Sequence, residues 1–189
     1  MTRLMAVTFT LALATVAAGC GRSGTTVINT GGSKTPAAGP SAEGKKYLLN
    51  QEPVGGKGVL AVKDAAKDGD DVVVVGRIGG DKKPFTQGRA VFVVLDPSVK
   101  FCNEIGDDAC ETPWDCCCGI SAADLAKAKV TVKFADGQGK TLPLDAKSDL
   151  GLLEMQTVAV RGKVKKDEKG NMTVLASAVY PTPVPEKKP

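Results

Sequence analysis

The residues of this chain best suited to chemistry are five cysteines in one short segment, residues 101–118. Their spacing is C-x7-C-x5-C-C-C, which places them at Cys102, Cys110, Cys116, Cys117 and Cys118. The segment also carries five carboxylates and no lysine or arginine. Thiolates with carboxylates suit Zn²⁺ or a soft ion such as Cu(I), and thiols also form disulfides or take part in redox exchange. The sequence therefore leaves a metal site, a redox site and a disulfide-stabilised loop open.

We favour the disulfide-stabilised loop among these three interpretations. The segment has no C-x2-C pair of the zinc-ribbon kind, and the chain contains no histidine. A reactive thiol needs a cationic neighbour or a helix N-terminus, and nearby carboxylates disfavour the thiolate instead. Because adjacent cysteines do not readily bridge one another, we expect disulfides from the triplet 116–118 back to Cys102 and Cys110. An odd number leaves one thiol over, and Cys118, which lies closest to a predicted helix, is the best candidate.

Two other features of this segment allow more than one interpretation. Trp114, the only tryptophan, either packs over the loop as part of a small apolar cluster or is exposed as an anchor for a partner. We favour packing. The acidic residues lack the D-x-D-x-D-G order of a known calcium loop, so we interpret them as a solvated rim.

Composition limits the possible activities of the chain. The absence of histidine excludes Ser-His-Asp and Cys-His catalysis and histidine metal ligands. Residues 47–180 contain 18 Lys and Arg against 19 Asp and Glu, a net charge of −1 (18 − 19). A surface that binds nucleic acid needs clustered cations, so we do not expect nucleic acid as a partner. We also expect no enzymatic activity.

The N-terminus carries an export signal. Arg3 precedes an apolar stretch over residues 4–18, which is too short for a membrane span. The stretch ends in A-A-G-C, with the cysteine at Cys20, and this resembles the lipobox of bacterial lipoproteins. The resemblance implies a signal peptide at 1–19 and a diacylated Cys20 that anchors the chain to a membrane of the cell envelope, at the outer membrane or on the periplasmic side. Ordinary secretion, with Cys20 left over, is the alternative.

Most of the remaining chain has β patterning, bounded by two segments without it. Residues 20–46 are rich in Gly, Ser, Thr and Pro and predict a flexible tether, and residues 181–189 predict a disordered proline-rich tail. β-branched runs and period-2 alternation predict strands at 71–78, 89–95, 130–134, 157–164 and 172–180. A further piece at 141–144 is interrupted by Pro143 and is predicted to lie at an edge of the sheet. Short helices are predicted at 148–155 and, capped by Ser121, at 121–128.

The order of these elements resembles the OB-fold, in particular the small periplasmic OB-fold proteins of bacteria. The similarity lies in V-V-G-R-I at 74–78, V-R-G-K-V at 160–164 and a helix before the fourth strand. It implies a mainly β domain over 47–180: a five-stranded Greek-key barrel with one or two short helices. A Cys-rich insert at 97–129 departs from this family. Its T-P-W-D-C-C core resembles exported bacterial proteins to which no activity is attached.

The sequence thus predicts a lipid-anchored cell-envelope protein that acts as a non-enzymatic binding or structural module. Its expected partners are the membrane, through the N-terminal lipid, and an envelope protein or a small ligand. The first alternative is a metal-binding or thiol-redox protein that uses the loop from Cys102 to Cys118, in which case a metal ion is the one cofactor. The second is nucleic-acid binding, a common use of the OB-fold.

Overall fold

The computed structural model describes residues 39–106 and 109–183. The predicted signal peptide, the lipidation site Cys20, two acidic residues of the insert and the end of the tail therefore lie outside the described residues. Within the described ranges, no helix has the length and apolar character that crossing a membrane requires.

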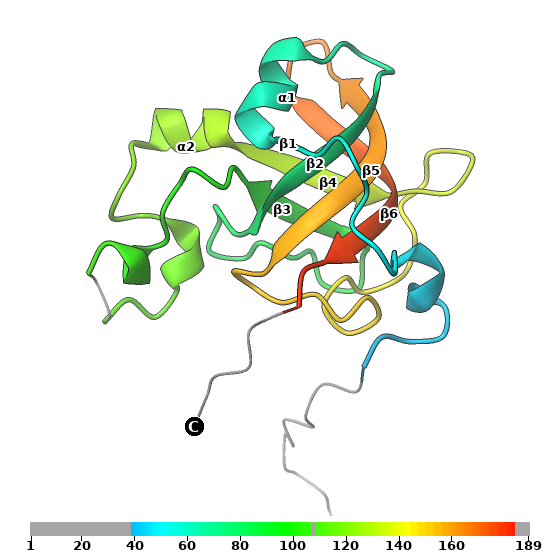
Figure 1. Cartoon of the computed structure of the whole chain (residues 1–189), viewed down its shortest axis with the longest axis horizontal. Helices are drawn as coiled ribbons and strands as arrows, with labels where there is room; N and C mark the ends of the chain where they lie inside the picture. Colours follow the sequence, from blue (N-terminus) through cyan, green and yellow to red (C-terminus); the bar gives the residue numbers. More distant parts are fainter. Residues whose placement is uncertain (1–38, 107–108, 184–189) are drawn as a thin grey trace, which may run out of the picture. The chain divides into compact units, whose positions relative to one another are not determined.

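Five strands form a closed mixed barrel, and a sixth, very short strand extends it (Figure 1). The strands are β1 (Lys57–Gly58), β2 (Asp71–Ile78), β3 (Val91–Leu95), β4 (Lys129–Phe134), β5 (Thr157–Lys166) and β6 (Met172–Pro181). They are hydrogen-bonded in the order β1-β2-β3-β4-β6-β5, and antiparallel pairing of β2 with β5 closes the barrel. Among the five barrel strands β2 to β6, the pair β4–β6 is parallel and the other pairs are antiparallel. This arrangement confirms the predicted OB-like barrel.

Glycines inside two strands lie where neighbouring strands leave no room for a side chain. The pairing of β5 with β6 shifts register between Arg161 and Gly162, so a β-bulge lies there. A Cβ on Gly76 would lie 2.3 Å from a Val94 methyl and 2.5 Å from the Leu95 carbonyl oxygen. Strand β3 crosses β2 too closely for any side chain at that point.

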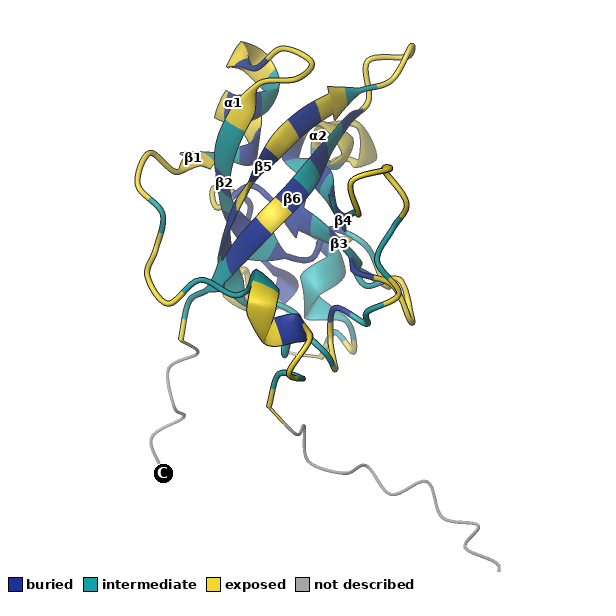
Figure 2. Cartoon of the chain, turned by 90° about the vertical axis from the view of Figure 1, so that its right-hand side faces the viewer, coloured by how far each residue is buried: buried dark blue, intermediate teal, exposed yellow. Residues whose placement is uncertain are grey.

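The barrel interior is filled by side chains from alternate strand positions, and buried and exposed segments follow one another along β5 and β6 (Figure 2). Phe92 and Phe134 are the largest side chains at its centre, with ring centroids 6.5 Å apart. Burying apolar area of this kind contributes roughly 25 cal/mol per Å², which makes the interior the main source of the barrel's stability.

Two helices cover parts of the barrel. Helix α1 (Val59–Ala65) follows β1, and neither element was predicted, although Val59, Val62 and Ala66 have helical spacing and are all buried. Gly58, at the N-cap of α1, has no side chain to cap the helix, and the carboxylate of Asp96 accepts the Leu60 amide at 2.9 Å instead. A Cβ on Gly58 would lie 2.7 Å from that carboxylate, so only glycine leaves room for it.

Helix α2 (Ala122–Ala128) confirms a prediction. Ser121 is its N-cap, and the serine side chain accepts the Asp124 amide at 3.1 Å. At the other end of α2, the Lys63 ammonium from α1 donates to the backbone carbonyls of Ala126, Lys127 and Lys129 at 2.9–3.0 Å. A single side chain of α1 thus holds the C-terminus of α2.

Two predicted elements between β4 and β5 are absent from the structure. Residues 148–155 form turns rather than a helix, because Gly151 and Met155 both have positive φ, +68° and +67°. Leu150 and Leu152 are nevertheless buried and fill this end of the barrel, as the predicted helix would have done. The predicted edge piece at 141–144 is reduced to a single bridge between Ala135 and Thr141.

Residues 39–46, assigned by sequence to the tether, already contact the barrel. A 3-10 turn (Gly44–Tyr47) lies here, and the Ser41 amide donates to the Asp149 carbonyl at 2.9 Å. Gly44 is buried so closely against Asp149 that a Cβ there would meet its carbonyl oxygen. The barrel's contacts therefore extend to residues that precede the predicted boundary at residue 47.

Candidate metal centre

The cysteine-rich insert connects β3 to β4 and leaves the barrel as a loop whose ends meet. The Asp96 amide donates to the Ala128 carbonyl at 2.8 Å where the two strands separate. Between these points lie two 3-10 turns, Cys102–Glu104 and Pro113–Asp115, and then helix α2. Because so little of it is regular structure, the insert depends on side-chain contacts for its shape.

A small apolar cluster beneath the insert, here called the satellite cluster, attaches it to the barrel. Its buried members are Leu95, Val99, Phe101, Cys116 and Ala128. Trp114 is half-buried against this cluster, and its indole N–H donates to the Lys82 carbonyl at 3.2 Å. These contacts are of the kind expected from the packing interpretation of Trp114. The Trp114 carbonyl in turn accepts the Gly80 amide at 2.7 Å.

Arg77 on β2 is the residue of this region that sequence reasoning missed. Its guanidinium lies 3.8 Å from the centre of the Phe101 ring and binds Glu104 through two hydrogen bonds of 2.8 Å. Glu104 also accepts a hydrogen bond from the Phe101 amide. The Arg77 guanidinium is the main cause of a lowered pKa of the Glu104 carboxyl; the Phe101 amide also lowers this pKa, while burial opposes the shift. The cysteine-bearing segment 101–118, which has no lysine or arginine of its own, therefore has a cationic neighbour. The outward position of Arg77 within V-V-G-R-I was the one available signal.

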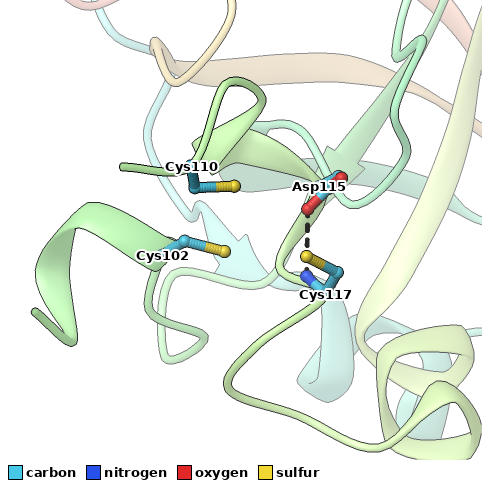
Figure 3. A group of neighbouring side chains, drawn as sticks. All are labelled: Cys102, Cys110, Asp115 and Cys117. Carbon is cyan, nitrogen blue, oxygen red and sulfur yellow. Dashed lines mark hydrogen bonds between the residues drawn. The ribbon is translucent and has the colours of Figure 1, made fainter. Parts of the chain in front are cut away.

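Three cysteines and one aspartate of the insert converge, and we call them the cysteine cluster: Cys102, Cys110, Asp115 and Cys117. Their ligand atoms, three sulfurs and a carboxylate oxygen, all lie within 4.8 Å of one another. Figure 3 shows these side chains directed toward a common centre. In a tetrahedral site with Zn–S bonds of about 2.3 Å, neighbouring sulfurs are separated by about 3.8 Å, so a small contraction would complete the coordination.

The disulfides favoured by the sequence are not formed in the structure. Among the described residues, no two cysteine sulfurs are at bonding distance, and the five loop cysteines carry no disulfide. The sulfurs of Cys117 and Cys118 lie 3.4 Å apart, well beyond the roughly 2.05 Å of an S–S bond. Of the triplet, Cys117 lies beside Cys102 and Cys110 and Cys118 lies beside Cys102, but Cys116 does not join them.

Cys102 lies at the centre of this group. It is fully buried, and burial alone would raise the pKa of its thiol. Hydrogen bonds from the Cys118 backbone amide and from the side chains of Cys118, Cys110 and Cys117 outweigh burial and lower this pKa. N–H and S–H groups directed at one sulfur favour its anionic form, which is the form that binds metal.

Asp115 is oriented by its own loop. One carboxylate oxygen accepts the Cys117 amide at 3.0 Å, the hydrogen-bonded pair in Figure 3, and the other accepts the Thr112 hydroxyl at 2.9 Å. Burial alone would raise the pKa of Asp115, but these hydrogen bonds and the charge of Lys82 lower it, so the carboxylate is ionised. Carboxylates that bind metal ions are typically held in place by hydrogen bonds of this kind.

Cys116 and Cys118 differ from the members of the cysteine cluster and from each other. Cys116 adopts a left-handed conformation, φ 59°, and its side chain is buried in the satellite cluster, where its sulfur lies 3.7 Å from the Trp114 carbonyl oxygen. Burial, with the negative charges of Cys102 and Asp115, raises the pKa of Cys116 to about 11. Cys118, predicted as the odd thiol, contacts both Cys117 and Cys102.

No protein-family model matches the chain, and no curated protein matches it at a significant level. Fold and site geometry are therefore the basis for any functional conclusion.

Proposed function

We propose that this protein is a lipid-anchored, non-enzymatic module of the cell envelope whose barrel carries a metal-binding insert. The observation that supports metal binding is the convergence of Cys102, Cys110, Asp115 and Cys117, with ligand atoms within 4.8 Å of one another. Three sulfurs and one carboxylate oxygen form a donor set suited to Zn²⁺. A bound ion would stabilise the insert directly, since ligands held together by the ion cannot separate without releasing it.

The lipid anchor in this proposal is supported by the A-A-G-C sequence that ends at Cys20, which lies outside the described residues. The near-neutral charge of residues 47–180 gives no reason to add nucleic acid to the partners.

Metal analysis of the full chain, purified under reducing conditions from zinc-supplemented cells, tests the proposal. We expect about one zinc ion per chain, because the cluster offers one set of four ligands. Cys102→Ser and Cys110→Ser should each lose the ion, whereas Cys116→Ala, which alters a cysteine outside the cluster, should keep it. A folded chain that binds no zinc, or whose cluster cysteines are joined in disulfides when isolated without reductant, would contradict the proposal.

A further inference from the structure

The insert places a fifth metal-binding side chain beside the four of the cysteine cluster. The Cys118 sulfur lies 3.4 Å from the Cys117 sulfur, and both the backbone amide and the thiol of Cys118 reach the sulfur of Cys102. A four-coordinate ion held by Cys102, Cys110 and Cys117 thus has Asp115 at its fourth position and the Cys118 thiol beside two of its three sulfurs.

The two candidates for the fourth position differ in chemistry. Asp115 offers a hard oxygen, which Zn²⁺ accepts, whereas Cys118 offers a soft sulfur, which Cu(I) and similar ions prefer. They also differ in attachment. The Asp115 carboxylate is held by two hydrogen bonds from its own loop, while the Cys118 side chain is exposed.

The conformation of Cys116 explains why the adjacent cysteines divide in this way. Its left-handed backbone reverses the chain, so that its own side chain enters the satellite cluster while Cys117 and Cys118 return toward Cys102. One member of the triplet is thereby removed from the metal site and two are directed to it.

We infer that the site is a two-state ligand set: Zn²⁺ is held with Asp115, and a soft ion of the Cu(I) class is held by four sulfurs, with Cys118 in place of Asp115. This inference rests on the proposed function, since it requires that Cys102, Cys110 and Cys117 bind the ion in both states. Each thiol that becomes a ligand releases its proton to water, so no oxidant or reductant takes part.

Thiol labelling of the unaltered full chain provides the first test, with Cd²⁺ as an air-stable soft probe. The chain is loaded with either Zn²⁺ or Cd²⁺ and treated with an alkylating reagent, and the modified cysteines are located by peptide mass. We expect Cys118 to be alkylated in the zinc form and protected in the cadmium form, with Cys102, Cys110 and Cys117 protected in both. Equal labelling of Cys118 in the two forms would overturn the inference and leave the proposed function intact.

Affinities of variants, measured by competition with a chromophoric chelator, provide the second test. Cys118→Ser should weaken Cd²⁺ binding by at least about tenfold and change Zn²⁺ binding by less than about twofold, while Asp115→Asn should do the reverse. Cys116→Ala is the matched control and should change neither. If Cys118→Ser weakens both ions equally, Cys118 is a ligand in every state and the inference is wrong. If the unaltered chain binds neither ion, the proposed function fails as well.

Discussion

The barrel and the cysteine insert are stabilised by different kinds of contact. The barrel encloses one continuous apolar interior, and the pairing of β2 with β5 along seven residues of each strand closes it. The insert has five buried apolar residues, one short helix and a few polar contacts: the Arg77–Glu104 pair, the Lys63 contacts with α2 and the hydrogen bonds around Asp115. Barrel stability is therefore set by packing, whereas the insert depends on a small number of individual side chains.

The largest expected effect compares two fully buried phenylalanines, Phe92 of the barrel and Phe101 of the insert. Phe92→Ala should lower the free energy of unfolding by about 3–5 kcal/mol, because it opens a cavity in the shared interior. Phe101→Ala should unfold the insert while the barrel stays intact.

Two signals separate these outcomes. Trp114 is the only tryptophan and lies in the insert, so its fluorescence follows the insert, while far-ultraviolet circular dichroism follows the barrel. In urea, the two signals should change together in Phe92→Ala and separately in Phe101→Ala. Coincident transitions in Phe101→Ala would show that the two regions unfold as one unit.

A second, intermediate effect concerns Arg77. Arg77→Met removes two charge-assisted hydrogen bonds to Glu104, and because Glu104 is partly exposed we expect a loss of about 1–2 kcal/mol in the stability of the insert. The measurement is the rate of limited proteolysis within residues 97–129. Arg161→Met, which alters an exposed arginine on β5, is the matched control and should leave this rate unchanged.

The smallest effect lies where the two regions join. Burial alone would raise the pKa of Asp96, but hydrogen bonds from Ser98 and from the Leu60 and Val59 amides lower it. A carboxyl whose pKa is lowered by folding stabilises the protein above its unfolded value of about 3.9, and this contribution is lost as the pH falls through the folded value. Asp96→Asn should therefore cost about 1 kcal/mol at neutral pH, and the difference from the unaltered chain should shrink in acid.

Denaturant unfolding at a series of pH values measures this effect. Asp64→Asn, at an exposed position on helix α1, whose N-terminus Asp96 caps, is the control for a change of charge alone. A constant difference between Asp96→Asn and the unaltered chain from neutral to acid pH would contradict the assignment.

Sequence patterns predicted the barrel well because strand signals are local. The run D-V-V-V-V-G-R-I became β2 with its predicted bounds, and Gly162 marks a bulge. The predicted helix at 148–155 is wrong because positive φ at Gly151 and Met155 turns the chain, and burial of Leu150 and Leu152 needs no helix. Helix α1 was missed because its cap, Asp96, comes from another part of the sequence.

The candidate site was predicted in composition but not in arrangement. The cysteines were identified, yet their spacing favoured disulfides because it lacks a zinc-ribbon pair. Two facts that decide the arrangement are not visible in the local sequence. One is the left-handed backbone conformation of Cys116, which residues other than glycine rarely adopt. The other is the position of Arg77, which contacts the insert only once the barrel has closed.

The meeting of the ends of the insert has a consequence for how the chain reaches its fold. In a simple barrel, β3 and β4 would form a tight hairpin and pair early, but here Leu95 pairs with Lys129 across the whole insert. Lengthening a two-residue connection to about 32 residues amounts to four doublings, which adds about 2.4 kcal/mol of loop-closure entropy. The pairing of β3 with β4, which a tight hairpin would make local in sequence, is therefore a long-range contact. An ion bound as proposed by Cys102, Cys110 and Cys117 would shorten the effective loop before the two strands meet.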